Sequence, residues 1–428
     1  MKLLSKIFQP VITIPKGAKI KNTEITCKSQ KLLLECGLVR PTSTGFFTLL
    51  PLARRALTKL ENIVHRCLED VGAQQISLPC LTSSRLWEAS GRLDRVGSEL
   101  LKVEDRHNKK YILSPTHEEA IADLLSDVAP LSHKQLPFIL YQIGNKYRDE
   151  LRPKHGLLRS REFLMMDAYS VHTDTDSALC TYDTLTHAYR NVFRELRLPV
   201  RRVEAPSGDM GGTLSHEWQL PAPSGEDCLS VCPSCSHTTL LEEGKEGRKC
   251  VACGRETEIC SSIEVGHTFV LGDRYSAPIV MACYGIGLTR LLAASVELLS
   301  SERSLRWPHA LAPYKAIVIG PKEGSKEWVH HDSPRLEQLG AQVEAVAGDV
   351  VLDDRHHLTI GKRLLQADKT GYPYIIVCGR SALESPPRYE LHRDQGEVLT
   401  LPLNELLAFI KDDNKERDLK FKRESEYI

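Results

Sequence analysis

The chain has 428 residues, enough for two or three domains, and its 41% share of apolar residues is ample for packed cores. Basic and acidic residues are equal at 56 each, so a protein held on nucleic acid by bulk charge is excluded and any RNA contact must use local basic patches. No apolar run is long enough to span a membrane, and 13 cysteines with two CxxC pairs favour reduced thiols and one metal site over a secreted disulfide scaffold.

Residues 1–30 are interpreted as an N-terminal extension. Five lysines precede the first acidic residue, Glu24, and such a basic start suits an organelle-targeting segment. The stretch before Glu24 contains no arginine and little serine, however, so its support for targeting is slight.

A helix is predicted over residues 31–37, and a second, long and amphipathic helix is predicted after Pro51. Its apolar residues recur every three or four positions, Gly72 is a plausible C-cap, and a β-prone segment, 73–78, follows before Pro79. The stripe consists of Leu57, Leu60, Val64, Leu68 and Val71. On its own this pattern indicates a helix packed on a strand.

A helix is also predicted to start near Ala120. Thr116 as its N-cap, with Glu119 three residues later, forms a capping box pattern that stabilises a helix start.

Residues 141–172 read as two apolar strands around a long loop that contains Pro153 and Gly156, which predicts an antiparallel hairpin. Arg148, Arg159 and Arg161 lie on or beside these strands. Arginines in a buried setting need anionic partners, and the guanidinium fork matches a polyphosphate.

The flat apolar ring of Phe163, close by, suits a purine. The alternative interpretation is a ladder of salt bridges with Glu150 and Glu162.

An amphipathic helix is predicted over 174–198, and a Gly/Ser-rich turn enters a strand within 206–220. In this segment Glu217 is a candidate site residue and His216 is interpreted as structural. A further strand is predicted over 263–272. Residues 281–290 end in Gly285-Ile-Gly287 and open an apolar helix that carries Arg290 in its first turn.

Two CxxC pairs lie fourteen residues apart, within an insert assigned to residues 228–260. Paired knuckles around a short hairpin are typical of a tetrahedral zinc ribbon with four cysteine ligands, which would fold mainly through its metal. The alternatives are free thiols or a knuckle that has lost its metal. The four cysteines are Cys232, Cys235, Cys250 and Cys253.

Trp307-Pro308 and Ala312-Pro313 mark a linker, after which the pattern alternates between strand and helix. Strands are predicted at 316–319, 342–346 and 374–378, with helices at 332–339 and 360–370, which indicates a compact α/β domain with parallel strands. The tail beyond residue 411 is highly charged and predicted to fray.

The hairpin carries a family resemblance. Arg148-Asp149-Glu150 and the returning Arg159–Phe163 segment resemble motif 2 of the class II aminoacyl-tRNA synthetases, in the version of the bacterial and mitochondrial prolyl-tRNA synthetases. The long helix ending in the strand before Pro79 is similar to motif 1, and residues 281–290 are similar to motif 3. Residues 351–355 and 359–363 resemble the anticodon-binding domain shared by prolyl, threonyl, histidyl and glycyl synthetases.

This resemblance implies an α+β protein, with a catalytic antiparallel sheet flanked by helices over 31–307 and an α/β anticodon-binding domain over 312–412, followed by a tail at 413–428. It also implies a ligase that forms prolyl-adenylate from L-proline and ATP and transfers the prolyl group to tRNA(Pro). The motif 1 match implies a homodimer. The insert of about 35 residues replaces a large editing domain, so editing in cis is expected to be absent. The editing-free form resembles mitochondrial enzymes, which favours the mitochondrial matrix, with the cytoplasm as the alternative.

The resemblance also implies residue roles. Arg148 would grip the α-phosphate of ATP and the substrate carboxylate, Phe163 would stack on adenine, and Arg290 would contact the γ-phosphate. The implied ATP site comprises Arg148, Glu150, Arg159, Phe163, Glu264, Gly287 and Arg290, with Mg²⁺ on Glu264. The implied proline site comprises Thr116, Glu118, Arg148, His267 and Gly285. The implied anticodon contacts are Asp354, Arg355 and Lys362, with a solvated loop of mixed charge as the alternative.

The sequence departs from the family pattern in a few places. About fifteen to twenty residues usual after Tyr275-Ser276 are missing, so either a tight turn trims the sheet edge or activity is compromised. Ala282 stands where glycine is usual and would crowd the proline pocket; Met166 stands where lysine is usual. The shortened segment supports the alternative of a non-catalytic, tRNA-binding paralogue. Another class II synthetase, threonyl or histidyl, is the second alternative.

Overall fold

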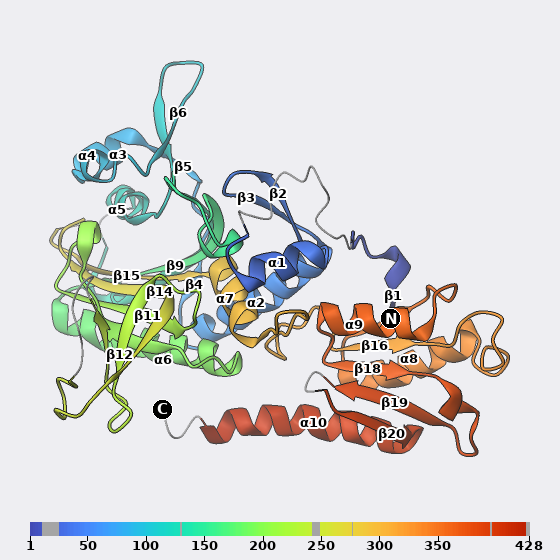
Figure 1. Cartoon of the computed structure of the whole chain (residues 1–428). Helices are drawn as coiled ribbons and strands as arrows, with labels where there is room; N and C mark the ends of the chain where they lie inside the picture. The colour runs from blue at the N-terminus through green and yellow to red at the C-terminus, as the bar shows by residue number, and fades with distance from the viewer. Residues whose placement is uncertain (11–24, 129–130, 242–248, 276, 394–395, 425–428) are drawn as a thin grey trace.

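The computed structural model describes residues 1–10, 25–128, 131–241, 249–275, 277–393 and 396–424, with the backbone alone from 415 onward. Its two main sheets lie side by side in Figure 1, a nine-stranded sheet in the region before residue 300 and a six-stranded sheet in the C-terminal region. Ser276 lies outside the described residues, as do most of the N-terminal extension and residues 242–248 of the cysteine-rich insert.

The nine-stranded sheet has the path β10-β11-β14-β15-β9-β8-β4, with β12 and β13 attached to β14. Its neighbours pair antiparallel, apart from the parallel pair of β4 and β8. The bounds are β4 Gln74–Gln75, β8 Phe138–Tyr147, β9 Glu162–His172, β10 Arg201–Glu204, β11 Leu214–Pro221, β12 Asp227–Val231, β13 Thr238–Leu241, β14 Glu258–Gly272 and β15 Val280–Gly287.

The predicted hairpin at the centre of this sheet is confirmed. Strands β8 and β9 pair in unbroken register from Phe138 opposite Val171 to Tyr147 opposite Glu162. Because side chains alternate between the two faces, Met166 and Ala168 enter the helix-covered core, while Phe163, Met165 and Asp167 line a cavity on the other face.

Helices cover the core face of the sheet. They are α1 (Lys28–Glu35), α2 (Pro51–Glu69), α6 (Thr175–Glu195) and α7 (Leu288–Leu299). The apolar stripe predicted on α2 is buried within this chain, with Leu57, Leu60, Val64 and Leu68 at most 1% exposed. A short hairpin of β2 (Val39–Ser43) and β3 (Phe46–Leu49) connects α1 to α2.

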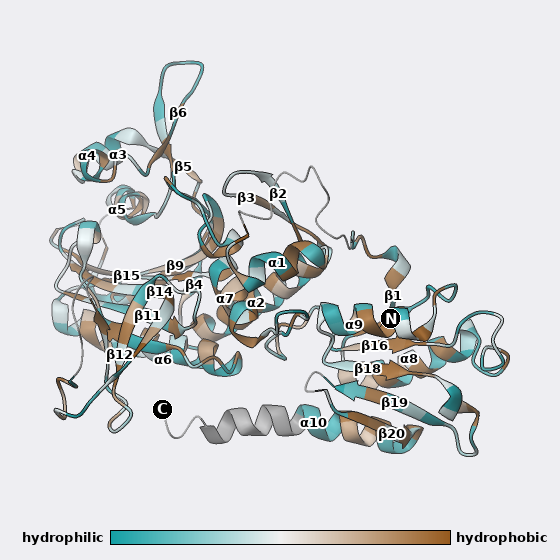
Figure 2. Cartoon of the chain, viewed as in Figure 1, coloured by the Kyte–Doolittle hydropathy of each residue, from teal (hydrophilic) through white to brown (hydrophobic). Residues whose placement is uncertain are grey.

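A small lobe stands over the cavity face. It contains the three-stranded sheet β5-β7-β6 and the helices α3, α4 and α5, and its hairpin projects outward in Figure 1. The tip of that hairpin is mostly hydrophilic in Figure 2. The bounds are β5 Leu81–Ser83, α3 Ser84–Ala89, α4 Arg92–Arg95, β6 Leu101–Glu104, β7 Lys110–Leu113 and α5 Glu118–Asp127.

The C-terminal sheet has the order β1-β17-β16-β18-β19-β20. The predicted strands β16 and β18 pair in parallel, and β17, which was not predicted, also runs parallel to β16. Strands β19 and β20 run antiparallel to their neighbours. Helices α8 and α10 pack on one face and α9 on the other. The bounds are β16 Ala316–Ile319, α8 Ser333–Ala347, β17 Val350–Asp353, α9 Ile360–Thr370, β18 Tyr374–Val377, β19 Arg388–Arg393, β20 Val398–Pro402 and α10 Leu403–Glu424.

The strand predicted at 342–346 is wrong, because α8 continues through it to Ala347. Gly340 is buried and does not break the helix, and Leu336, Leu339 and Val343 keep the helical spacing of the buried face. The prediction of a frayed tail is also wrong as far as residue 424, where α10 ends.

The start of the chain belongs to the C-terminal sheet, which the sequence did not suggest. Strand β1 (Lys2–Leu3) pairs in parallel with β17, and the backbone N–H of Ser5 donates to Asp354 at 2.8 Å. No helix in the described part of the chain is long and apolar enough to cross a membrane.

The shortened segment before β15 leaves the sheet intact. Strands β14 and β15 pair from Gly272 opposite Met281 to Gly266 opposite Ile286, with one bulge. The described residues on both sides of position 276 therefore keep the nine-stranded sheet continuous.

Candidate functional site

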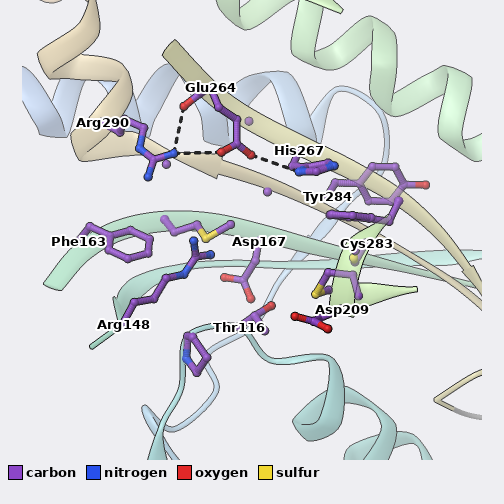
Figure 3. Close-up of a pocket in the computed structure, with 18 of the residues that line it drawn as sticks. Thr116, Arg148, Phe163, Asp167, Asp209, Glu264, His267, Cys283, Tyr284 and Arg290 are labelled. Atoms are coloured by element: carbon purple, nitrogen blue, oxygen red, sulfur yellow. Dashed lines mark hydrogen bonds and ion pairs between the residues drawn. The ribbon is translucent and has the colours of Figure 1, made fainter. Parts of the chain in front are cut away.

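A cavity of about 330 Å³ lies on the face of the nine-stranded sheet that faces the small lobe. It brings together residues from β9, β14, β15, the segment after β8, the start of α5 and the first turn of α7. Of the predicted site residues, it is lined by Thr116, Glu118, Arg148, Glu150, Phe163, Glu264, His267, Gly285, Gly287 and Arg290. Figure 3 shows most of these side chains around one space.

Arg148 directly follows strand β8, and its guanidinium carbon lies 5.2 Å from the centre of the Phe163 ring. Among the described residues, this guanidinium has no hydrogen bond or ion pair to an internal acid. Burial and the neighbouring Arg290 lower the pKa of Arg148, against the opposing effect of Glu264. The group remains a cation and is available for an anionic ligand.

Arg290 approaches the same space from the other side, in the first turn of α7. Its Nε donates to the carbonyl of Leu158 at 2.8 Å, and its Nη1 lies 3.2 Å from an oxygen of Glu264. Burial raises the pKa of Glu264, but the hydrogen bond from His267 and the charge of Arg290 outweigh it and bring this pKa to about 2. Glu264 is therefore ionised at neutral pH and holds Arg290 in position.

Arg159 lies at the edge of this arrangement. It lines a second cavity of about 260 Å³, which is also lined by Arg148 and Arg290. Its Nε is 2.9 Å from Glu150 and its Nη1 is 2.8 Å from Glu226. Arg148, Arg159 and Arg290 therefore line one common cavity. Arg159, however, pairs with two internal carboxylates, as the salt-bridge alternative for the hairpin expects of an arginine.

Glu162 does not join that ladder. It accepts hydrogen bonds from Asn145 at 2.9 Å and Tyr147 at 3.2 Å. The third arginine of the hairpin, Arg161, donates to the carbonyl of Glu150 and lies 3.4 Å from Asp149.

The far end of the cavity is acidic and buried. Helix α5 starts at Glu118 with His117 as N-cap and has no side-chain cap, so the predicted capping box is wrong. The Thr116 hydroxyl instead donates to the Glu118 carboxylate at 2.7 Å, and Glu118 is 2% exposed. The two residues reach the cavity together because the helix begins between the sheet and the small lobe.

Arg92 is a cavity residue that the sequence did not single out. It is 3% exposed, lies 3.3 Å from Glu118 and 3.0 Å from Glu119, and stacks on the Trp87 ring at 4.7 Å. Its single available signal was a pair of adjacent glutamates at a helix start, which requires a cation from elsewhere in the chain.

Asp167 and Lys146 are a second missed pair. Asp167 lines the cavity, the two side chains are 2.6 Å apart, and both are buried. Each is a charged residue in a strand rich in apolar residues, and that pattern was the signal available in the sequence.

His267 lies on β14 between the two ends of the cavity. Its Nε2 is 2.7 Å from the Ser215 hydroxyl, its Nδ1 is 3.2 Å from Glu264, and its ring stacks on Phe269 at 4.0 Å. Glu217 is 3.9 Å from the same nitrogen, so Glu217, Glu264 and His267 form a cluster of ligand atoms within 4.8 Å of one another.

His216 lies on the opposite face of β11. It is 9% exposed, and its Nδ1 is 2.8 Å from the Tyr182 hydroxyl, as suits a structural residue.

Ala282 does not crowd the cavity. It is fully buried in the core face of β15, opposite Ser170 and Val270, and Met166 lies in the same core. The expected conflict was therefore wrong, because position 282 alternates away from the cavity. Gly285 does face it, where an added Cβ would lie 2.3 Å from the Met165 methyl.

The three residues predicted to contact the anticodon lie after β17 and in the first turn of α9, and two of them have internal partners. Asp354 accepts from Ser5, and Arg355 forms a forked pair with Asp353. Lys362 is exposed in the first turn of α9.

The four cysteines of the insert converge at the turn of the β12–β13 hairpin. The Sγ atoms of Cys232 and Cys253 are 3.5 Å apart, and those of Cys235 and Cys250 are 3.6 Å apart. Sulfurs of a tetrahedral zinc site with bonds of about 2.3 Å lie about 3.8 Å apart, so the donor set and its spacing fit zinc. None of the 13 cysteines, all of which the structure describes, forms a disulfide.

Comparison with known proteins relates both parts of the chain to tRNA synthetases. The model of the class II tRNA synthetase core domain (G, H, P, S and T) matches residues 101–298, and that of the anticodon binding domain matches residues 316–413.

A human protein named probable proline--tRNA ligase, mitochondrial, is 43% identical over 424 residues, which cover 93% of this chain and 88% of the relative. The protein of the same name from Schizosaccharomyces pombe is 36% identical, covering 88% of this chain and 94% of the relative. The proline--tRNA ligase of Ehrlichia chaffeensis is 34% identical, covering 86% and 91%.

The solved structure of Giardia lamblia prolyl-tRNA synthetase in complex with prolyl-adenylate superposes with a TM-score of 0.74 at 18% identity, over 91% of this chain and 80% of that one. At this identity the likeness concerns the fold.

Proposed function

The chain belongs to the prolyl-tRNA synthetases of class II, and from this premise we propose how its own residues activate L-proline with ATP and transfer it to tRNA(Pro). The observation that carries the proposal is one cavity that holds two opposed guanidinium groups, an apolar ring and a buried carboxylate. These features suit a triphosphate, an adenine and the ammonium of an amino acid, respectively.

In the first step an oxygen of the proline carboxylate attacks the α-phosphorus of ATP, an O–P bond forms, and the bond to the β-phosphate breaks to release pyrophosphate. Arg148 would bind the substrate carboxylate and the α-phosphate, so that it aligns the two reacting groups. Its lack of an internal partner among the described residues supports this role, since no salt bridge must break first.

Arg290 would neutralise the charge that develops on the departing pyrophosphate. It is held by Glu264 and by the carbonyl of Leu158, which fixes the guanidinium before ATP arrives. No side-chain nucleophile is needed, because positioning and charge neutralisation carry the step.

The adenine would stack on Phe163, over whose ring the Arg148 guanidinium already lies at 5.2 Å. Glu150 and Arg159 would border the phosphates, with their own ion pair keeping Arg159 in place. The glycines at 285 and 287 would let the nucleotide and the amino acid approach the backbone.

The proline ring would lie at the acidic end. Its secondary ammonium has two N–H donors, and the Thr116 hydroxyl and the Glu118 carboxylate can accept both. His267 would border the ring, oriented by Ser215 and Glu264.

In the second step a hydroxyl of the terminal adenosine of tRNA(Pro) attacks the prolyl carbonyl and AMP leaves. The C-terminal domain would bind the anticodon, as its family match implies. Lys362 is the most exposed of the three predicted contacts. Asp354 and Arg355 are bonded to Ser5 and Asp353, so to bind a base they would have to share these partners or release them.

Magnesium would be held by Glu264, with Glu217 and His267 within reach. When bound, the ion supplies positive charge to the ATP phosphates. The low pKa of Glu264, about 2, keeps this ligand ionised.

Zinc would be held by the four converging cysteines as a structural ion. The described strands on either side, β12 and β13, are too short to bury a core of their own, so the metal would stabilise the hairpin.

A homodimer and a mitochondrial location are also proposed. The dimer rests on the motif 1 resemblance of α2 and the segment after it, because the apolar stripe of α2 itself is used inside the chain. The location rests on the names of the human and yeast relatives, although bacterial relatives are also similar.

The test is ATP–pyrophosphate exchange by the purified protein with each amino acid in turn. Exchange that depends on proline alone is expected. Exchange with threonine or histidine would assign another specificity, and tRNA binding without any exchange would favour the non-catalytic alternative.

A further inference from the structure

The buried cluster of Arg92, Glu118 and Glu119 contains two carboxylates and one guanidinium. All three side chains are 2–4% exposed, so water screens their charges little. The cluster lies beside the cavity, which Arg92 and Glu118 line but Glu119 does not.

Glu119 is bound more closely to Arg92 than Glu118 is. Arg92 Nη1 is 3.0 and 3.1 Å from the two oxygens of Glu119, against 3.3 Å from Glu118. The Ser90 hydroxyl also donates to Glu119 at 2.9 Å, whereas Glu118 accepts from Thr116 at the cavity wall. Glu119 thus neutralises Arg92 from behind, and the remaining negative charge lies on Glu118.

With two carboxylates and one guanidinium, the cluster gives the amino-acid subsite a net charge of −1. Among the other charged groups of the cavity wall, Asp167 is paired with Lys146, and Asp209 is exposed at the rim. Arg148 is assigned to the substrate carboxylate and the α-phosphate, whose negative charges compensate it. An uncompensated guanidinium beside Glu118 would repel the ring ammonium, whereas a neutralised Arg92 can hold the Glu118 carboxylate in place without opposing the ligand.

We propose that Arg92 and Glu119 are positioning residues that set the charge of the amino-acid subsite, so that it accepts a cationic ring nitrogen and rejects uncharged analogues of proline. The inference rests on the proposed function, in which Glu118 binds that nitrogen. It assigns a specificity role to two residues that do not touch the substrate's reacting atoms.

The test is a charge-balance cycle measured by ATP–pyrophosphate exchange. In Glu119→Gln the charge of Arg92 is left to neutralise Glu118, so the subsite loses its net negative charge. The KM for proline should rise by at least about tenfold, with the KM for ATP unchanged within about twofold. Arg92→Met together with Glu119→Gln restores one net negative charge, and the KM for proline should recover by at least about threefold relative to Glu119→Gln alone. Glu88→Gln, on the exposed side of α3, is the matched control.

A second readout uses tetrahydrofuran-2-carboxylate, which has a neutral oxygen in place of the ring ammonium. The ratio of its inhibition constant to the KM for proline should fall in Glu119→Gln, because the neutral subsite no longer favours the cation. A purely structural role would weaken both ligands equally and leave the ratio unchanged.

An unchanged KM for proline in Glu119→Gln, or a double variant worse than Glu119→Gln alone, would overturn the inference. If Arg92→Met prevents folding, Glu119→Gln and the inhibitor ratio decide the matter by themselves. Loss of exchange in the unmodified protein would instead overturn the proposed function, so the two failures are distinguishable.

Discussion

Replacing Arg148 by alanine tests the link between geometry and adenylate formation. The side chain would make charge-assisted hydrogen bonds to a phosphate oxygen and to the substrate carboxylate, each contributing about 1.5–3 kcal/mol. Losing two such bonds costs about 3–6 kcal/mol of transition-state stabilisation, which corresponds to a decrease of about 10²–10⁴-fold in exchange. Arg148→Lys keeps a positive charge but loses the forked pair of donors, so its exchange rate should lie between those of the unmodified protein and Arg148→Ala.

The fold should tolerate the change. The guanidinium contacts the Phe163 ring and faces Arg290, which lowers the pKa of Arg148, so little internal stabilisation is lost. The free energy of unfolding should change by about 1 kcal/mol or less. Exposed Arg85 on α3, replaced by alanine, is the control and should keep full exchange. Near-normal exchange by a folded Arg148→Ala protein would refute the role assigned to this residue.

Three further predictions concern the metal, pH and assembly. Metal analysis should find about one zinc per chain and almost none in Cys250→Ser, with exposed Cys180→Ser as the control; a zinc-free, folded unmodified protein would contradict the ribbon. Burial lowers the pKa of His172 from 6.5 to about 4, so its contribution to stability is full above pH 6.5 and is lost as pH falls through about 4. The free energy of unfolding should drop by about 3 kcal/mol as pH falls from 6.5 to 4, and His172→Gln should make it less dependent on pH in this range. An unchanged pH dependence in His172→Gln would contradict the assignment to His172. Light scattering should give twice the 48.0 kDa chain mass, and a monomer with full exchange activity would exclude an obligate dimer.

The sequence predicted those features that depend on local patterns. The long helix α2, the hairpin of β8 and β9 and the helix α9 follow from periodicity and turn residues, and the structure contains them. Arg148 and Phe163 were found because they lie within a short motif on that hairpin, and Arg290 because it lies within a short motif at the start of α7.

The features that were missed depend on distant contacts. Arg92 meets Glu118 and Glu119 only because the small lobe folds over the start of α5, and β1 pairs with a strand almost 350 residues away. Neither pairing leaves a periodic signal in the sequence.

Two wrong predictions have the same origin. A strand was predicted at 342–346, but the buried residues of α8 favour a helix that continues to Ala347. Thr116 suggested a cap, but its hydroxyl bonds to the Glu118 carboxylate in the cavity wall. In both cases tertiary packing outweighs the local preference.

The most direct test of the central claim is a crystal structure with 5′-O-(N-prolylsulfamoyl)adenosine, a stable mimic of prolyl-adenylate. The account predicts the adenine on Phe163, the sulfamoyl group within hydrogen-bond distance of Arg148, and the ring nitrogen between Thr116 and Glu118. An analogue that binds outside this cavity, or with its proline ring away from Glu118, would contradict it.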